Sequence, residues 1–358
     1  MVFLGGPRQV GKTTLAQTLI PQFYDGHPAY FNWDNPEHRA QIRIKGWPIH
    51  QKFIILDEIH KLKQWRNLVK GIYDTQKNTH QFMVTGSARL DHFRKGGDSL
   101  LGRYHYYRLH PYSLPELGVS RAHTLRLLQY GGFPEPLAAQ DERGLRRWHL
   151  SRLQRLIRTD VRDLENIQDL DKMELLAETL SSRVGAPLSY RNLAQDLELD
   201  PKTCRKWVDI LDAMYFCFRL SPFGAPKIKA VKKEQKLYLW DWSQIEDPGA
   251  RFENMVASHL LKFCHYHEDV NGYRMELRYL RDTEKREVDF VVLKQNKPLF
   301  AVECKLSSKA VGEQIHYFKR RTTIPKFYQV HLGEKAVSPT DGVFCLPFEK
   351  FVELESLV

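Results

Sequence analysis

A glycine-rich segment close to the beginning of the sequence constrains the fold more than any other feature. Gly6 is separated by four residues from Gly11, Lys12 and Thr13, and this segment lies between the apolar run VFL and the run TTLAQTLI. A brief apolar run is typical of a buried strand, whereas the second run has helical spacing. The segment therefore predicts a strand, a tight loop and a helix that begin a parallel sheet.

Three further apolar runs support the prediction of a sheet. AYFNW, KFIILDE and QFMVTGS are short and bounded by polar or turn residues, and helical patterns lie between them. Strands that alternate with helices are typical of a parallel sheet covered on both faces. We therefore expect an α/β P-loop domain over residues 1–118.

The spacing of the glycine-rich segment also predicts a function. Such glycines allow backbone N–H groups to turn inward around phosphates, while the lysine bridges the outer phosphates and the hydroxyl of Thr13 ligates magnesium. ATP and Mg²⁺ are therefore the predicted cofactors. The predicted nucleotide-binding residues of the loop are Gly6, Pro7, Arg8, Gln9, Val10, Gly11, Lys12, Thr13 and Thr14.

An acidic pair follows the strand predicted over Phe53–Leu56. Asp57 and Glu58 would stand at the carboxyl edge of the sheet, where ligands bind in open parallel sheets. Asp57 is suited to the magnesium site, and Glu58 is suited to act as the base that orients or activates the attacking water. Thr85 and Ser87 end the next strand, where either residue would hold that water or simply cap the strand.

Arginines are frequent in the helical segment predicted over residues 119–171, which we expect to form a lid or linker. Leu150, Leu153 and Leu156 recur at helical spacing, so an amphipathic helix with a basic face is predicted. That face would contact phosphates or simply be solvated. Its arginines are Arg143, Arg146, Arg147, Arg152, Arg155, Arg158 and Arg162.

Residues 172–242 have the pattern of a winged helix-turn-helix. Three helices are predicted, the second capped by Ser189 and the third opened by Pro201, and two strands follow them. The lysine-rich stretch 226–236 is predicted to be an exposed wing tip or loop. Basic residues of the third helix would contact phosphates, or the module would serve as a spacer or subunit contact. These residues are Lys202, Arg205 and Lys206.

A second α/β domain is predicted over residues 243–358. Asp289 and Glu303 fall on two apolar strands, and strand alternation puts Lys305 on the same face as Glu303. Glu253, on the preceding helix, would add a third carboxylate. Such a cluster can hold magnesium and activate a water that attacks a phosphodiester, with Glu303, Asp289 and Lys305 as catalytic residues. The alternative is a set of charges on exposed strand faces.

Composition narrows the class of partner. The 358 residues carry a formal net charge of +11, which favours polyanions such as nucleic acid over neutral surfaces. The five cysteines are scattered, and neither a secretory signal nor an apolar run of membrane-spanning length is visible. A cytoplasmic protein without a membrane partner is therefore expected.

The motifs together resemble a known family. GPRQVGKTTL, ILDEIHKL, VTGSARLDHFRKGGDSLLGRY and YGGFPEP resemble the AAA+-type P-loop ATPases of bacteria and archaea that carry a C-terminal domain of long-uncharacterised function. The resemblance implies an ATPase core, a winged helix and a restriction-endonuclease-like PD-(D/E)xK end. The phosphate-binding lysine falls on Lys12 and the acidic pair on Asp57 and Glu58. Family members usually have a helical segment before the first strand, whereas this sequence starts almost on the strand. This departure bears on the expected contacts to the adenine base and leaves the expected phosphate contacts unchanged.

The resemblance also implies a homo-oligomeric ring, for which a hexamer is one arrangement. Arg103 would then reach a neighbouring nucleotide and act as a catalytic residue there, or it would form a salt bridge. The predicted function is ATP hydrolysis coupled to DNA movement or to magnesium-dependent DNA cleavage. The alternatives are a non-cleaving switch that binds DNA or a partner, and a protein-remodelling ATPase.

Overall fold

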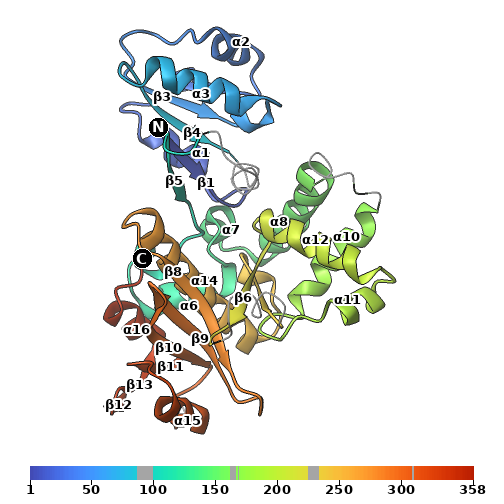
Figure 1. Ribbon diagram of the computed structural model, residues 1–358, viewed down its shortest axis with the longest axis vertical. Coiled ribbons are helices and arrows are strands. Elements are labelled where there is room, and N and C mark those ends of the chain that lie inside the picture. Colours follow the sequence, from blue (N-terminus) through green and yellow to red (C-terminus); the bar gives the residue numbers. More distant parts are fainter. Residues whose placement is uncertain (87–99, 162–166, 168, 225–233, 309) are drawn as a thin grey trace. The chain divides into compact units, whose positions relative to one another are not determined.

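The computed structural model describes residues 1–86, 100–161, 167, 169–224, 234–308 and 310–358. The chain forms two compact units (Figure 1). The first contains Met1–His110 together with Ala213–Tyr215, and the second contains Pro111–Asp212 together with Phe216–Val358. Within the described part of the chain, every helix is too short or too polar to cross a membrane.

The first unit is built on a five-stranded sheet whose neighbouring strands are all parallel, in the order β2-β3-β4-β1-β5. The four strands predicted from the apolar runs are confirmed. The strands are β1 (Val2–Gly5), β2 (Tyr30–Asn32), β3 (Phe53–Asp57), β4 (Gln81–Thr85) and β5 (His105–Arg108). The helices are α1 (Lys12–Thr18), α2 (Pro36–Ile44), the 3-10 turn η1 (Ile59–Lys61) and α3 (Trp65–Gln76).

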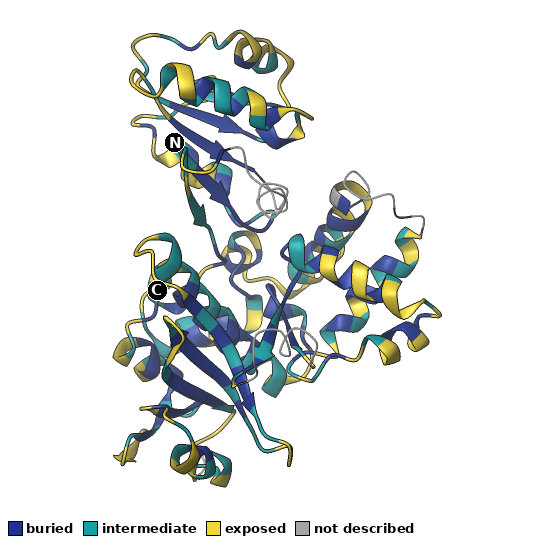
Figure 2. Ribbon diagram, viewed as in Figure 1, coloured by how far each residue is buried: buried dark blue, intermediate teal, exposed yellow. Residues whose placement is uncertain are grey.

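Helices cover both faces of this sheet, and strand alternation decides which side chain meets which helix. On β3, Ile54 and Leu56 pack in one cluster with residues of α2 and α3. Ile55 packs in the opposite cluster with Ala16 of α1. The inner strands β1, β3 and β4 are therefore mostly buried on both faces, as Figure 2 shows, which explains why their sequences are largely apolar.

The second unit begins with a group of helices. They are α5 (Leu114–Leu117), α6 (Arg121–Tyr130), α7 (Pro134–Ala139), α8 (Glu142–Arg155) and the π-helical segment η2 (Leu156–Val161). The basic face predicted for this region is wrong at Arg152, which is buried and stacks on the rings of Phe133 and Trp148. Leu150, predicted to face the core, is exposed.

The order of elements predicted for residues 172–242 is present. Three helices precede an antiparallel pair of strands, and the Ser189 hydroxyl caps the second helix at the backbone N–H of Asn192. The elements are α10 (Leu170–Ser181), α11 (Tyr190–Asp196), α12 (Pro201–Ala213), β6 (Cys217–Pro222) and β7 (Lys236–Leu239), followed by the 3-10 turn η3 (Trp242–Gln244).

The last part of the chain completes an eight-stranded sheet with the order β12-β13-β11-β10-β9-β8-β6-β7. The predicted helix and strands of this part are confirmed, and β6 joins them by pairing with β8. Helix α15 packs against one face of the sheet, while α14 and α16 pack against β8, β10, β11 and β13. The elements are α14 (Pro248–Asp269), β8 (Met275–Arg281), β9 (Glu287–Lys294), β10 (Lys297–Lys305), α15 (Glu313–Arg321), β11 (Phe327–His331), β12 (Val337–Thr340), β13 (Val343–Pro347) and α16 (Phe348–Leu354).

Candidate functional site

The loop between β1 and α1 has a backbone that only particular residues can adopt. Gly6 has a φ of 137°, and a Cβ atom there would lie 2.3 Å from the carbonyl oxygen of Leu109. Gly11 has a φ of 99°, and Gln9 also takes a left-handed conformation with a φ of 63°. Glycine is therefore required at position 6 for conformational and steric reasons together.

Lys12 places its ammonium group inside this loop. Its Nζ atom donates hydrogen bonds to the carbonyl oxygens of Gly6, at 3.0 Å, and Pro7, at 2.6 Å. The side chain is only 8% exposed, and such a buried charge needs polar neighbours. The loop thus holds a positive charge at the end of β1 nearest to the acidic pair.

Asp57 is the centre of a hydrogen-bond network at the carboxyl edge of the sheet. Its Oδ2 atom accepts hydrogen bonds from the hydroxyls of Thr13, at 2.9 Å, and Tyr30, at 2.7 Å. Its Oδ1 atom accepts one from the hydroxyl of Thr85. The strand register explains this meeting, because Asp57 is paired with Asn32 on one side and with Thr85 on the other.

Glu58 adjoins this network in a strained conformation, with a φ of 55°. A left-handed glutamate is uncommon, and strain of this kind is concentrated at functional sites. Its carboxylate lies 3.4 Å from Nζ of Lys61 and 3.5 Å from Nε2 of His60. Burial raises the pKa of Glu58, as does the neighbouring Asp57, while Lys61 and Lys12 lower it; the net shift is upward. A carboxylate with a raised pKa is suited to accept a proton.

The residues of this edge fit a nucleotide with magnesium. A hydroxyl and a carboxylate stand together at Thr13 and Asp57, and oxygen atoms are the ligands that Mg²⁺ prefers. The Oε1 atom of Gln9 is buried in the loop without a hydrogen-bond partner among the described residues. The structure therefore brings together Lys12, Thr13, Asp57 and Glu58. Ser87 lies outside the described residues.

Tyr30 is a member of the network that the sequence pattern does not predict. It lies on β2, whose run AYFNW predicts only an apolar strand. Alternation offers a signal, because Phe31 packs with α2 and α3 whereas Tyr30 packs on the face covered by α1. The ring of Tyr30 can therefore reach the side of the sheet on which the loop between β1 and α1 lies.

Arg103 lies away from this network within its own chain. It precedes β5, whose first residue His105 is paired with Val2 at the start of β1. Since the strands are parallel, Arg103 stands at the amino edge of the sheet, opposite to Asp57. Its Nε atom donates a hydrogen bond to Asp74 at 2.9 Å. Its role at a neighbouring subunit stays a prediction.

A second polar cluster lies in the sheet of the second unit. Lys305 Nζ donates a hydrogen bond to Glu303 Oε1 at 2.6 Å, which agrees with the alternation predicted for this strand. Gln314 Nε2 donates to the same oxygen at 3.0 Å. Asp289 accepts a hydrogen bond from the backbone N–H of Cys304 at 2.8 Å. The sequence therefore identified three residues that the fold brings close together.

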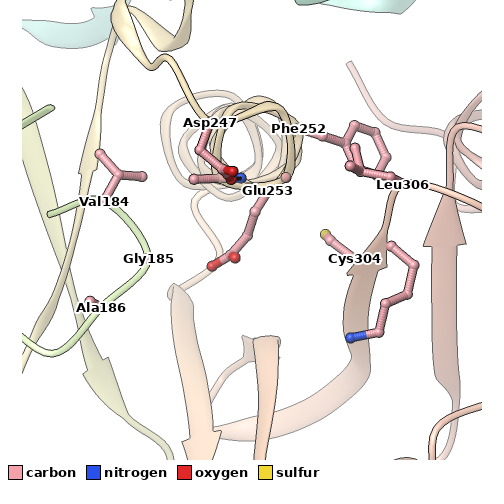
Figure 3. Close-up of a pocket in the computed structure, with 11 residues that line it drawn as sticks. Val184, Gly185, Ala186, Asp247, Phe252, Glu253, Cys304 and Leu306 are labelled. Atoms are coloured by element: carbon pink, nitrogen blue, oxygen red, sulfur yellow. Dashed lines mark hydrogen bonds between the residues drawn. The ribbon is translucent and has the colours of Figure 1, made fainter. Parts of the chain in front are cut away.

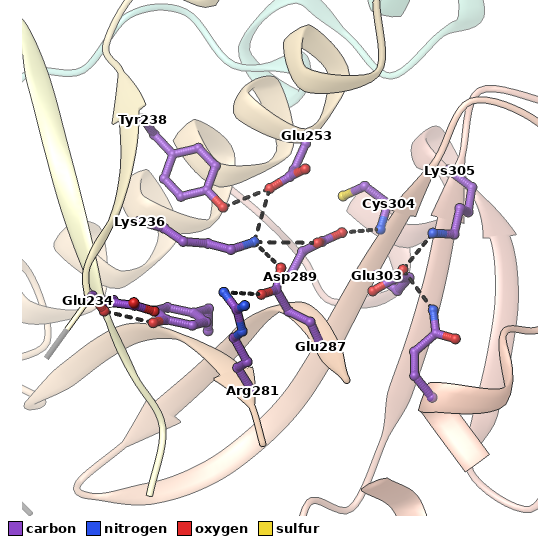
Figure 4. A network of polar contacts seen from close by, with 12 residues as sticks. Glu234, Lys236, Tyr238, Glu253, Arg281, Glu287, Asp289, Glu303, Cys304 and Lys305 are labelled. Carbon is purple, nitrogen blue, oxygen red and sulfur yellow. Dashed lines mark hydrogen bonds and ion pairs between the residues drawn. The ribbon is translucent and has the colours of Figure 1, made fainter. Parts of the chain in front are cut away.

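Lys236 joins this cluster, although the lysine-rich stretch to which it belongs predicts an exposed loop. It is the first residue of β7, is 1% exposed, and forms an ion pair with Glu287 (Figure 4). Its Nζ atom lies 3.7 Å from Glu253 Oε1 and 3.9 Å from Asp289 Oδ1. The prediction of an exposed stretch up to residue 236 is therefore wrong at its last residue, because strand pairing buries it.

The charges of the cluster are strongly perturbed by burial. Burial, together with repulsion from Glu253 and Glu303, raises the pKa of Asp289 well above its usual value. Burial also raises the pKa of Glu253. For Lys236, burial acts downward, but the attraction of the surrounding carboxylates raises its pKa overall. Lys236 therefore remains an ammonium ion over the usual pH range.

The predicted metal cluster of Glu253, Asp289 and Glu303 does not fit a metal ion in this arrangement. Among the described residues, no three His, Cys, Asp or Glu side chains form a group that could hold one. A pocket of about 420 Å³ opens beside the cluster, and Glu253 and Cys304 point into it (Figure 3). The ammonium of Lys236 lies among the carboxylates instead.

Family models match three consecutive parts of the chain. Residues 1–118 match an AAA domain. Residues 121–244 match a domain of unknown function (DUF8612), and residues 248–351 match another (DUF4143). The first unit of the structure therefore contains a domain of the AAA type. The carboxylates of the second cluster lie in the match over residues 248–351, and Lys236 lies in the match over residues 121–244.

Several curated relatives match most of the chain. An uncharacterized protein of Methanocaldococcus jannaschii is 24% identical over 89% of this chain and 78% of its own length. An uncharacterized protein of Mycobacterium tuberculosis is 24% identical over the whole chain and 82% of its own length. Among solved structures, the RuvB Holliday junction branch migration motor of Thermotoga maritima is 18% identical, with a TM-score of 0.29, over 61% of this chain and 81% of that one.

Proposed function

We propose that the chain hydrolyses ATP at the carboxyl edge of the first sheet. The observation that carries this proposal is the meeting of Lys12, Thr13 and Asp57 at one point, with Glu58 next to them. These residue types at these places are the ones that phosphoryl transfer to water requires. The match of residues 1–118 to an AAA domain supports the same activity.

In the proposed mechanism, Glu58 orients the attacking water and takes up its proton. The water oxygen forms a bond to the γ-phosphorus, and the bond from that phosphorus to the bridging oxygen of ADP breaks. Lys12 binds the outer phosphates, while Thr13 and Asp57 are the residues that would hold magnesium. The bound ion supplies neutralisation of the phosphate charge, and Tyr30 and Thr85 fix the position of the Asp57 carboxylate.

Steady-state ATP hydrolysis and nucleotide binding test this proposal together. Lys12→Ala should lose both, because the charge inside the loop is removed. Glu58→Gln should bind ATP but reduce turnover by at least about 100-fold, since the proton acceptor is replaced by an isosteric amide. The control is Lys77→Ala, which removes an exposed lysine at the end of α3.

Full ATP turnover by Lys12→Ala would contradict the proposal, and so would turnover by Glu58→Gln that equals wild type. A protein that binds no ATP at all would contradict it as well. Circular dichroism of each variant separates loss of activity from loss of structure.

We also propose DNA as the polyanion that the ATPase acts on. The support is the net charge of +11 and the exposed basic residues of α12, namely Lys202, Arg205 and Lys206. A homo-oligomer, in which Arg103 serves a neighbouring nucleotide, is part of this proposal. The position of Lys236 favours a DNA-binding switch that does not cleave DNA over a magnesium-dependent nuclease.

A further inference from the structure

We infer that Lys236 is the resident counter-ion of the carboxylate cluster, and that its ammonium group occupies the place of a divalent metal. The cluster consists of Glu253, Glu287, Asp289 and Glu303, and it lies entirely in the second unit. This inference does not depend on ATP hydrolysis, because it concerns other residues.

The position of the ammonium group is the first observation. Nζ of Lys236 pairs with Glu287 and lies within 4 Å of carboxylate oxygens of Glu253 and Asp289. These three carboxylates come from α14 and β9, so the ammonium stands where separate elements converge (Figure 4). A divalent ion would need oxygen ligands at about 2.0–2.6 Å from the same point. The two cations therefore exclude one another.

The anchoring of Lys236 is the second observation. Its strand pairs with β6, and the neighbouring Leu237 carbonyl accepts a hydrogen bond from the backbone N–H of Gly185 at 3.1 Å. On the same edge, the carbonyl oxygen of Gln235 accepts a hydrogen bond from the backbone N–H of Leu188 at 2.7 Å. The backbone around Lys236 is thus held on both edges. With β7 paired in this way, the side chain of Lys236 is 1% exposed and stays buried beside the carboxylates.

The balance of charge is the third observation. Buried carboxylates need paired cations or a metal, since desolvation of an unpaired charge is costly. Lys236 forms ion pairs with Glu253, Glu287 and Asp289, while Lys305 forms one with Glu303. Arg281 adds a contact of 3.7 Å to Glu287. With these cations in place, a divalent ion would have to displace an ammonium that is already bound.

Binding of Mn²⁺ to nucleotide-free protein, followed by electron paramagnetic resonance, tests the inference. The wild-type protein and Lys236→Arg should bind no Mn²⁺ at the carboxylate cluster. Adding Asp289→Asn to either protein should therefore leave the amount of bound Mn²⁺ unchanged. Lys236→Met, which removes the charge with little loss of volume, should gain one bound ion per chain. Lys236→Met combined with Asp289→Asn should lose that ion again. Any ion at the P-loop contributes equally to all of these proteins.

Thermal unfolding gives a second readout for the same proteins. Mn²⁺ should raise the unfolding midpoint of Lys236→Met by more than it raises that of the wild type, and the double variant with Asp289→Asn should lose this difference. The inference is overturned if wild-type protein binds Mn²⁺ in a manner that Asp289→Asn abolishes, or if folded Lys236→Met gains no ion. If Lys236→Met does not fold, the comparison of wild type with Asp289→Asn alone decides the matter.

Discussion

Asp57 accepts hydrogen bonds from three hydroxyl groups that belong to α1, β2 and β4. A buried carboxylate bonded in this way has a fixed orientation, because both oxygens already have donors. The carboxylates around Lys236 are organised differently, by an ammonium ion that comes from β7. The carboxylate of Asp57 and the carboxylates around Lys236 therefore have different electrostatic surroundings. Residue type alone does not reveal this difference.

Single glycines are decisive in the motif YGGFPEP. Gly132 leaves no space for a side chain, since a Cβ atom would lie 2.5 Å from the carbonyl oxygen of Tyr112 and 2.8 Å from the ring of Trp242. Gly131 has a φ of 74° and packs against Asp241 and Ser243. The motif therefore has a packing role in the second unit.

Gly132→Ala should lower the stability of the second unit by about 1–3 kcal/mol, because the added methyl group must displace backbone or the indole ring. The measurement is the thermal unfolding midpoint followed by tryptophan fluorescence. Gly71→Ala is the control of opposite sign. That glycine lies inside α3, and a Cβ atom there would meet only Nζ of Lys45, at 3.6 Å, so alanine should add about 0.5–1 kcal/mol to the stability of the first unit. An unchanged midpoint for Gly132→Ala would contradict the packing role.

At the scale of elements, α14 connects the start of the second unit to its sheet. Its buried His259 accepts a hydrogen bond at Nε2 from the backbone N–H of Leu114, at 2.9 Å. With Nε2 as acceptor, Nδ1 carries the proton and donates to the carbonyl oxygen of Met255, at 2.7 Å. Burial lowers the pKa of His259 to about 4, so the folded protein keeps this ring neutral.

This histidine predicts a loss of stability in acid. In the unfolded chain it takes up a proton near its ordinary pKa of about 6.5, whereas the folded chain resists protonation down to about 4. Its contribution is therefore present above pH 6.5 and is lost as the pH falls toward 4, by up to about 3 kcal/mol. The measurement is the unfolding midpoint from pH 7.5 to 4.5 for wild type and for His259→Gln, which does not titrate.

The difference between these two proteins isolates His259 from the other titrating groups. Wild type should lose stability more steeply than His259→Gln over this interval. Parallel curves would show that the ring is protonated in the folded state as readily as in the unfolded state.

At the scale of the whole molecule, the excess of positive charge predicts how DNA binding depends on salt. Each phosphate contact releases counter-ions, so the logarithm of the binding constant falls by about 0.9 for each contact per tenfold rise in salt. Fluorescence anisotropy with duplex DNA should therefore give a steep slope. Glutamate substitutions at Lys202, Arg205 and Lys206 should make the slope shallower by up to about 3.

Glutamate substitutions at Lys63, Lys77 and Lys350 provide the matched control, because these lysines are exposed and the change in net charge is equal. An effect of the same size in both triple variants would show that net charge, rather than α12, directs binding. Weak binding that salt does not alter would favour the protein-remodelling alternative.

Local pattern was sufficient for much of this molecule. The strands β1 to β4 follow from short apolar runs, and the loop from Gly6 to Thr13 follows from its spacing. The pairing of Lys305 with Glu303 follows from alternation within one strand. These features depend on neighbours in sequence, since the repeat of a helix or strand sets which side chains share a face.

Tertiary structure alone decided the surroundings of Lys236, Arg152 and Tyr30. A lysine beside a basic stretch has the sequence of a solvated loop, but pairing of β7 with β6 and the approach of α14 enclose it among carboxylates. Arg152 has the spacing of a surface residue, but the ring of Phe133, which precedes α7, covers its guanidinium group. The physical reason is the same in each case: burial and charge pairing depend on segments distant in sequence, and no local repeat records which segments meet.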